Sequence, residues 1–169
     1  TEAYLYPAVK FNFGLFGKWS IPKKLLIKSI FSFWYTKNRI LDYQIEFARI
    51  SKGKIPQEDV PVLYSSSRIN LNCTLQDCVN WDVITLRTYE ILACRGFLIS
   101  DKVPSAEKKL KNMVVFTEGS NDLISKITYF LERADEREQI ADRGYKYVVE
   151  NETLSERMNR LMDYLLEVL

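Results

Sequence analysis

Three charged residues stand close together in a largely apolar stretch of the chain: Asp82, Arg87 and Glu90. A carboxylate in a nucleotide-binding cleft accepts hydrogen bonds from ribose hydroxyls, which makes the two acidic residues candidates for such a contact. The alternative is an i,i+3 ion pair between Arg87 and Glu90 on one helical face, worth about 0.2 to 0.5 kcal/mol, with Asp82 as an N-cap. The residue types alone leave both interpretations open.

A second candidate site combines glycines with lysines near the start of the chain. The run KFNFGLFG carries Gly14 and Gly17, and Lys18, Lys23 and Lys24 follow it. Glycines let backbone approach a ligand closely, and a helix N-terminus favours negative charge, so this combination suits a phosphate or diphosphate. A simple glycine turn followed by solvated lysines explains the same residues, and the sequence alone favours that interpretation.

Hydrophobic periodicity, turn residues and start signals predict alternating strands and helices. The expected elements are a strand over 10–17, a helix over 23–36, a strand over 43–47, a helix over 58–66, a strand over 68–74, a loop over 75–81, a helix over 83–94, a strand over 96–100, a loop or short helix over 104–111, a strand over 113–116, and helices over 121–132, 135–150 and 153–168. This alternation predicts a Rossmann-like α/β fold, a three-layer αβα domain with a parallel sheet and a helical C-terminus.

In an open parallel sheet, ligands bind outside the carboxyl ends of the strands. Three loops are therefore expected to meet there: Gly14–Lys24, Cys73–Asp82 and Ser100–Ser105. The two candidate groups above lie in or beside these loops. We therefore expect one ligand site at this edge of the sheet.

Composition excludes several classes of function. The chain of 169 residues has no histidine, which excludes Ser-His-Asp and Cys-His catalysis and disfavours a zinc site. Its net charge of +2 and pI near 8.3 are too mild for a nucleic-acid groove, where a pI above about 9 is typical. No run reaches the length of a membrane span, and we expect a cytoplasmic protein. The basic, aromatic stretch 23–39 leaves contact with a membrane surface as an alternative to a sheet-covering helix.

The order of motifs resembles a known family. The segments FGLFGKW, GKIPQEDVPVLYSSSRINLN, LRTYEILACRGFLISD and DLISKITYFLERADEREQIADRGYKYVVENETLSERM are similar to the C-terminal, donor-binding half of GT-B glycosyltransferases, and most similar to the CgeB-like group, also labelled glycosyltransferase group 1. The resemblance extends from about Val9 to Leu169. Its most specific part runs from Arg87 through Glu90 and Gly96 to Asp101. Cys94, Arg95 and Gly96 stand where relatives carry a small residue and two glycines.

The resemblance implies roles for the candidate residues. Glu90 matches a glutamate that contacts the donor ribose, Asp82 stands eight positions earlier as a shortened first carboxylate, and Arg87 orients Glu90 or binds phosphate. Asp82 and Glu90 would be the catalytic pair. The donor-binding residues would be Gly14, Gly17, Lys18, Arg87 and Glu90, and the segment from Gly53 to Ile55 would pass near the base.

The implied activity is hexosyl transfer from a nucleoside diphosphate sugar, with a UDP-sugar as the expected donor and no metal or other cofactor. Residues 1–9 are expected to be a linker from an N-terminal acceptor domain, and residues 10–169 the donor-binding domain. Two alternatives stay open. One is a non-catalytic nucleotide-binding or scaffolding domain with this fold, and the other is a sugar-nucleotide epimerase.

Overall fold

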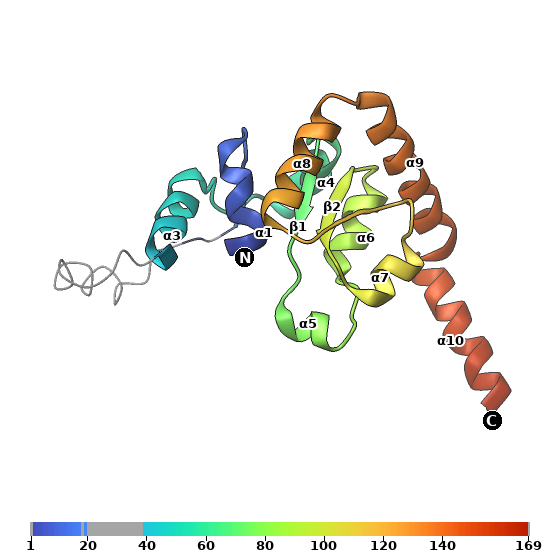
Figure 1. The fold of residues 1–169 in the computed structure, drawn as a ribbon. Coiled ribbons are helices and arrows are strands. Elements are labelled where there is room, and N and C mark those ends of the chain that lie inside the picture. The colour runs from blue at the N-terminus through green and yellow to red at the C-terminus, as the bar shows by residue number, and fades with distance from the viewer. Residues whose placement is uncertain (1, 18, 20–38, 169) are drawn as a thin grey trace.

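The computed structural model describes residues 2–17, 19 and 39–168 (Figure 1). Lys18 and the helix expected over 23–36 lie outside these residues, as does most of the basic stretch considered for membrane contact. The described elements are α1 Glu2–Leu5, the 3-10 helix η1 Tyr6–Lys10, α3 Arg39–Ile50, the 3-10 helix η2 Gln57–Asp59, α4 Val60–Ser66, β1 Asn70–Asn72, α5 Gln76–Asn80, α6 Leu86–Ala93, β2 Leu98–Asp101, α7 Pro104–Lys109, β3 Val115–Thr117, α8 Ser120–Leu131, α9 Ala134–Asn151 and α10 Leu154–Val168.

A parallel three-stranded sheet in the order β1-β2-β3 forms the centre of the fold. Leu71 of β1 pairs with Ile99 of β2, and Ile99 pairs with Val115 of β3. All four residues of β2 are buried, as expected for a central parallel strand covered by helices. The predicted Rossmann-like α/β fold with a helical C-terminus is confirmed.

Two hydrophobic clusters use opposite sides of β2, because neighbouring side chains in a strand point to opposite faces. Ile99 belongs to the cluster formed with α8 and α9, together with Phe97, Leu123, Ile127, Phe130 and Ile140. Leu98 belongs to the cluster formed with α6 and the C-terminal part of α9, together with Ile91, Leu92, Leu110 and Val148. The uninterrupted apolar run from Phe97 to Ile99 therefore supplies both cores.

The expected first strand is not a strand of this sheet. Among the described residues of 10–17, only two isolated bridges form, a parallel bridge between Leu15 and Ser51 and an antiparallel bridge between Gly17 and Gly53. The two glycines both have positive φ angles, 121° and 75°, and extended strand pairing cannot continue through that conformation. The predicted glycine turn is present, but it pairs with the segment 51–53 and does not follow a strand of the sheet.

The strand predicted over 43–47 is wrong, because Arg39–Ile50 forms the helix α3. Tyr43 and Phe47 are one helical turn apart and their rings contact each other at 5.7 Å between centroids. Phe47 is fully buried, whereas Ile45 between them is exposed. Aromatic and β-branched residues favour strands, but residues spaced by four lie on one face of a helix. The packing of that face around Phe47 stabilises the helix here.

One further segment differs from expectation, because the predicted loop 75–81 contains the short helix α5.

The chain before Phe11 forms α1 and η1, and Ala8 in η1 is 1% exposed within the core cluster of α8 and α9. Small size lets Ala8 enter that cluster, and the chain around it packs against the domain.

The junction of α9 and α10 is built around Glu152, whose side chain is only 3% exposed. Its carboxylate binds Lys109 from α7 at 2.7 Å and Arg157 from α10 at 2.9 Å, with Arg160 at 3.6 Å and a hydrogen bond from Tyr147 at 3.1 Å. Burial alone would raise the pKa of Glu152, but the hydrogen bond from Lys109 and the other donors lower it overall. This carboxylate therefore fixes the direction in which α10 leaves the domain (Figure 1).

Glu152→Gln is expected to lower the free energy of unfolding by about 2 kcal/mol, because charged hydrogen bonds are lost while three cations stay together. Glu150→Gln is the matched control, since Glu150 is exposed and makes no hydrogen bond or ion pair with the described residues. Urea unfolding at pH 7 measures both variants. Equal stability of the two variants would show that the Glu152 cluster does not stabilise the fold.

Candidate functional site

The carboxyl ends of the strands are organised by the buried carboxylate of Asp101, which is 4% exposed. Its Oδ2 accepts a hydrogen bond from the Thr74 amide at 2.8 Å. Its Oδ1 accepts from the hydroxyls of Thr74 at 2.8 Å and Ser100 at 3.0 Å. These bonds tie the loop after β1 to the end of β2, so Asp101 shapes this edge.

A second carboxylate, Asp122 at the start of α8, performs the same task at the end of β3. Its Oδ2 accepts from the Thr117 hydroxyl at 2.7 Å, the Glu118 amide at 3.0 Å and the Lys126 ammonium at 2.6 Å. The hydrogen bond from Lys126 is the main reason that the pKa of Asp122 falls to about 2. The loop between β3 and α8 is therefore pinned in place.

Asp82 binds the start of α7 instead of capping its own helix. Its two oxygens accept from the Ser105 amide at 2.7 Å and the Ser105 hydroxyl at 2.6 Å. The N-cap of α6 is Thr85, so the alternative of Asp82 as N-cap of that helix is wrong. The side-chain hydrogen bond from Ser105 is the main cause of a lowered pKa at Asp82. Asp82 thus connects two of the three loops expected to meet here.

Arg87 and Glu90 lie on α6 and face Tyr64 of α4. The Arg87 guanidinium lies near enough to the Tyr64 hydroxyl to act on its pKa, and no Arg87–Glu90 ion pair forms within the described residues. Burial raises the pKa of the Tyr64 hydroxyl; Arg87 acts to lower that pKa, and Glu90 to raise it. Burial and the Glu90 charge likewise raise the pKa of the Cys94 thiol. The alternative of an Arg87–Glu90 ion pair is therefore wrong, and Arg87 lies beside Tyr64 of α4 instead.

The Glu90 carboxylate is half-buried and accepts no hydrogen bond from any residue that the structure describes. Asp82, Asp101 and Asp122 all use their oxygens to hold neighbouring loops. Among these four carboxylates, Glu90 is the one with both oxygens available to a ligand. Asp82 and Glu90 contact different elements, and the structure shows no direct contact between them.

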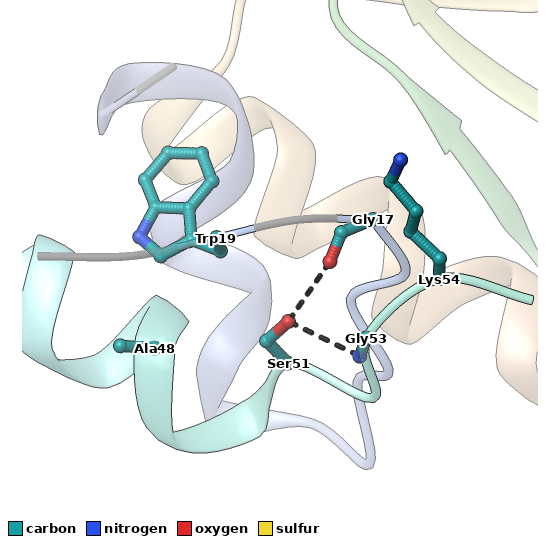
Figure 2. A pocket seen from close by; sticks show the side chains of 6 residues that line it. All are labelled: Gly17, Trp19, Ala48, Ser51, Gly53 and Lys54. Atoms are coloured by element: carbon teal, nitrogen blue, oxygen red, sulfur yellow. Dashed lines mark hydrogen bonds between the residues drawn. The ribbon is translucent and has the colours of Figure 1, made fainter.

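A shallow pocket of about 340 Å³ lies where the glycine turn crosses the chain near Ser51 (Figure 2). The Gly17 amide donates to the Gly53 carbonyl at 2.8 Å, and the Ser51 hydroxyl donates to the Gly17 carbonyl at 3.2 Å. The residues that line the pocket are Gly17, Trp19, Ala48, Ser51, Gly53 and Lys54. The positive φ angles of Gly17 and Gly53 favour glycine at both positions. A Cβ at either position would meet nothing within 4 Å, so the space above them is open.

The predicted phosphate loop is represented in this pocket by Gly17. Gly14 is exposed and lies outside the lining, and Lys18 lies outside the described residues. Sequence analysis missed Trp19 and Ser51, whereas Lys54 belongs to the segment 53–55 that the resemblance placed near the base. A signal was present, because the dipeptides Gly17-Lys18 and Gly53-Lys54 repeat the same pair of residues in two segments.

Comparison of the sequence with models of known protein families gives one match. A family model described as glycosyl transferase-like matches residues 5–163, which is most of the chain. The chain belongs to the glycosyl transferase-like family. No curated protein matches it. The expectation of a glycosyltransferase is confirmed at the level of this family, and the match includes the pocket, α6 and the strand ends.

Two features of the described part of this glycosyl transferase-like chain concern membranes and metal ions. None of the described helices is long and apolar enough to cross a membrane. Nor do the described residues include a group of three or more acidic or cysteine side chains that could hold a metal ion. Both observations concern only the ranges 2–17, 19 and 39–168.

Asp122→Asn is expected to remove part of the protection against low pH. A carboxyl group whose folded pKa of about 2 lies below its unfolded value of 3.8 stabilises the fold above pH 4, and that stabilisation is lost as the pH falls from about 4 to 2. Thermal midpoints between pH 2 and 7 measure the effect. The midpoint of the wild type should fall more steeply than that of the variant over this interval, and parallel curves would contradict the assignment.

Asp82→Ala and Ser105→Ala are expected to be non-additive, because each removes the same pair of hydrogen bonds. The double variant should unfold at nearly the same urea concentration as Asp82→Ala alone. Ser125→Ala serves as a control, since Ser125 bonds only to Asn121 in its own helix. Full additivity of the Asp82 and Ser105 effects would show that the two side chains do not act together.

Proposed function

We propose that the chain is the donor-binding half of a GT-B glycosyltransferase of the CgeB-like group, transferring a sugar from a UDP-sugar. The observation that carries the proposal is the Glu90 carboxylate, which has no hydrogen-bond donor among the described residues and lies on the same helix as Arg87 in a glycosyl transferase-like domain. A half-buried carboxylate without donors is unfavourable unless a ligand or water supplies them. The two hydroxyls of a ribose supply such donors.

Arg87 supports this function through its position. Its guanidinium lies near the Tyr64 hydroxyl of α4 while the residue stays exposed. An exposed guanidinium next to a ribose-binding carboxylate can bind a phosphate oxygen. Arg87 therefore complements Glu90 by binding the part of the donor that carries negative charge.

The diphosphate is proposed to lie against the crossing of the glycine turn. Of the residues that the resemblance assigns to the diphosphate, Gly17 lines this crossing, and the open space above Gly17 and Gly53 allows close approach of a ligand. Gly14 lies outside the lining, and Lys18 lies outside the described residues. Charge that develops on the departing diphosphate is stabilised by backbone N–H groups and lysines, and this role requires no metal. The chain from Lys54 to Asp59 connects this pocket directly to α4, which carries Tyr64.

Asp82 is proposed as the first carboxylate of the pair. Its hydrogen bonds to Ser105 hold it at the start of α7, and each carboxylate oxygen keeps a second lone-pair direction for a sugar or phosphate group. Arg95 does not oppose donor binding, because it is held by α9. Its guanidinium pairs with Asp142 at 2.8 Å and lies 5.0 Å from the ring centre of Tyr145.

The acceptor is proposed to bind to a separate N-terminal domain, as in the GT-B arrangement. The donor domain then contributes orientation of the sugar and stabilisation of the leaving diphosphate. The alternatives of a non-catalytic binding domain or an epimerase share this donor site. They differ in the product, which an assay with the complete protein identifies.

Calorimetric titration with UDP, GDP, ADP and dTDP tests the donor site. The wild-type chain is expected to bind one diphosphate selectively, and Glu90→Ala should weaken that binding about tenfold or more because charged hydrogen bonds to ribose are lost. The thermal midpoint should hardly change, since Glu90 bonds to no described residue. Glu150→Ala is the control on an exposed glutamate. Wild-type binding that survives in Glu90→Ala, or a collapsed midpoint, would contradict the assigned role.

A further inference from the structure

The last helix, α10, carries a continuous apolar stripe that the described part of the chain leaves exposed. The residues of this α10 stripe follow one another at alternating intervals of four and three: Leu154, Met158, Leu161, Leu165 and Val168. Their exposed fractions lie between 40% and 77%, and none of the described elements buries a residue of α10. Met162 and Tyr164, which are also exposed, widen the stripe on its two sides.

The spacing of the α10 stripe is that of a helix that packs along another helix. Apolar residues at alternating intervals of four and three occupy the a and d positions of a heptad, which form the seam of a two-helix coiled coil. A helix of 15 residues without a packed face is marginal in water, because most of its stability comes from burial of the apolar side. The stripe therefore indicates that a second helix lies along α10.

The domain holds α10 so that the whole length of the stripe stays accessible. Arg157 and Arg160 bind the buried carboxylate of Glu152 at 2.9 and 3.6 Å, and Lys109 binds the same carboxylate at 2.7 Å. By helical periodicity both arginines lie beside the stripe and not in it. Leu154 in the first turn remains 77% exposed. Figure 1 shows α10 extending from the end of α9 away from the sheet, so another helix can lie along the stripe from its first turn to its last.

The charges of α10 differ between its two halves. The first half is basic, with Arg157 and Arg160 against Glu156. The second half is acidic, with Asp163 and Glu167 and no basic residue. Two such helices in parallel would place like charges together, whereas an antiparallel pair places the basic end of each helix beside the acidic end of the other. The charge pattern of α10 is therefore complementary to a reversed copy of itself.

We infer that α10 is a self-association helix, and that the α10 stripes of two copies of this chain pack against each other in antiparallel orientation. Leu161 is the middle residue of the stripe, so it lies at the two-fold axis and faces its own counterpart, while Leu154 faces Val168. Such a pair is isologous, and association stops at the dimer. Packing removes both stripes from water, which is favourable for apolar side chains. The inference uses no residue of the donor site, so it is tested separately from the proposed function.

Sedimentation velocity of the full chain over a wide range of concentration measures this association. The wild type is expected to pass from monomer to dimer as its concentration rises. Leu161→Asp should weaken the dimer about tenfold or more, because it places a carboxylate at the buried axis. Leu161 belongs to neither core cluster, so this variant should fold. Asn159→Asp is the matched control, since it adds the same charge at an exposed position outside the stripe and should leave the association unchanged.

Cysteine cross-linking tests the orientation of the pair, with the unsubstituted chain and its Cys73, Cys78 and Cys94 as the background. On mild oxidation Leu161→Cys should give a disulfide-linked dimer, whereas Leu154→Cys should not. Self-cross-linking of Leu154→Cys would show a parallel pair and overturn the arrangement. A wild type that stays monomeric at every concentration would overturn the inference and leave the stripe to a helix of different sequence. A dimer that persists in Leu161→Asp would also overturn it, because association would then use another surface.

Discussion

The buried carboxylate of Asp101 is the interaction on which this edge of the sheet depends. A carboxylate at 4% exposure is costly to bury, and three hydrogen bonds from Thr74 and Ser100 offset that cost. The same bonds hold the loop after β1 against the end of β2. Because β2 is the central strand, the path of the chain from β1 through α5 to α6 is set from this point.

Asp82 and Asp122 hold the neighbouring loops by the same kind of hydrogen bonds. Each carboxylate accepts a backbone amide and a hydroxyl, from Ser105 in one case and from Glu118 and Thr117 in the other. Three acidic side chains are thereby used to fix loops at the sheet edge. This arrangement explains why Glu90 stands out. It is the acidic residue of α6 whose oxygens no described donor occupies, so its charge is left for a ligand.

The sequence predicted the elements whose local pattern agrees with their final packing. The run from Phe97 to Ile99 could only be a buried strand, because each of its side chains enters a core cluster. The segment around Tyr43 and Phe47 was predicted wrongly, since aromatic residues spaced by four satisfy both strand propensity and a helical face. Only the contact with Trp19 and Tyr6 shows which face is buried.

Candidate residues were predictable where the motif is continuous and not where distant segments cross. Arg87 and Glu90 stand in one run, so their types and spacing indicated a site. Trp19 and Lys54 belong to segments joined through the bridge between Gly17 and Gly53. No local sequence pattern indicates that the segment at Gly17 contacts the segment at Gly53. The partner of Arg87 was equally hidden, because Tyr64 reaches it from a different helix.

The helix α6 contacts other elements on two sides, and these contacts restrain the backbone that carries Arg87 and Glu90. On one side Arg87 contacts Tyr64 of α4. On the other, the ring of Tyr89 lies 4.6 Å from the Arg157 guanidinium and 5.7 Å from the Lys109 ammonium, both of which bind Glu152. Tyr89 is the immediate neighbour of Glu90. The Glu152 cluster therefore restrains the backbone that carries Glu90 without using the Glu90 carboxylate.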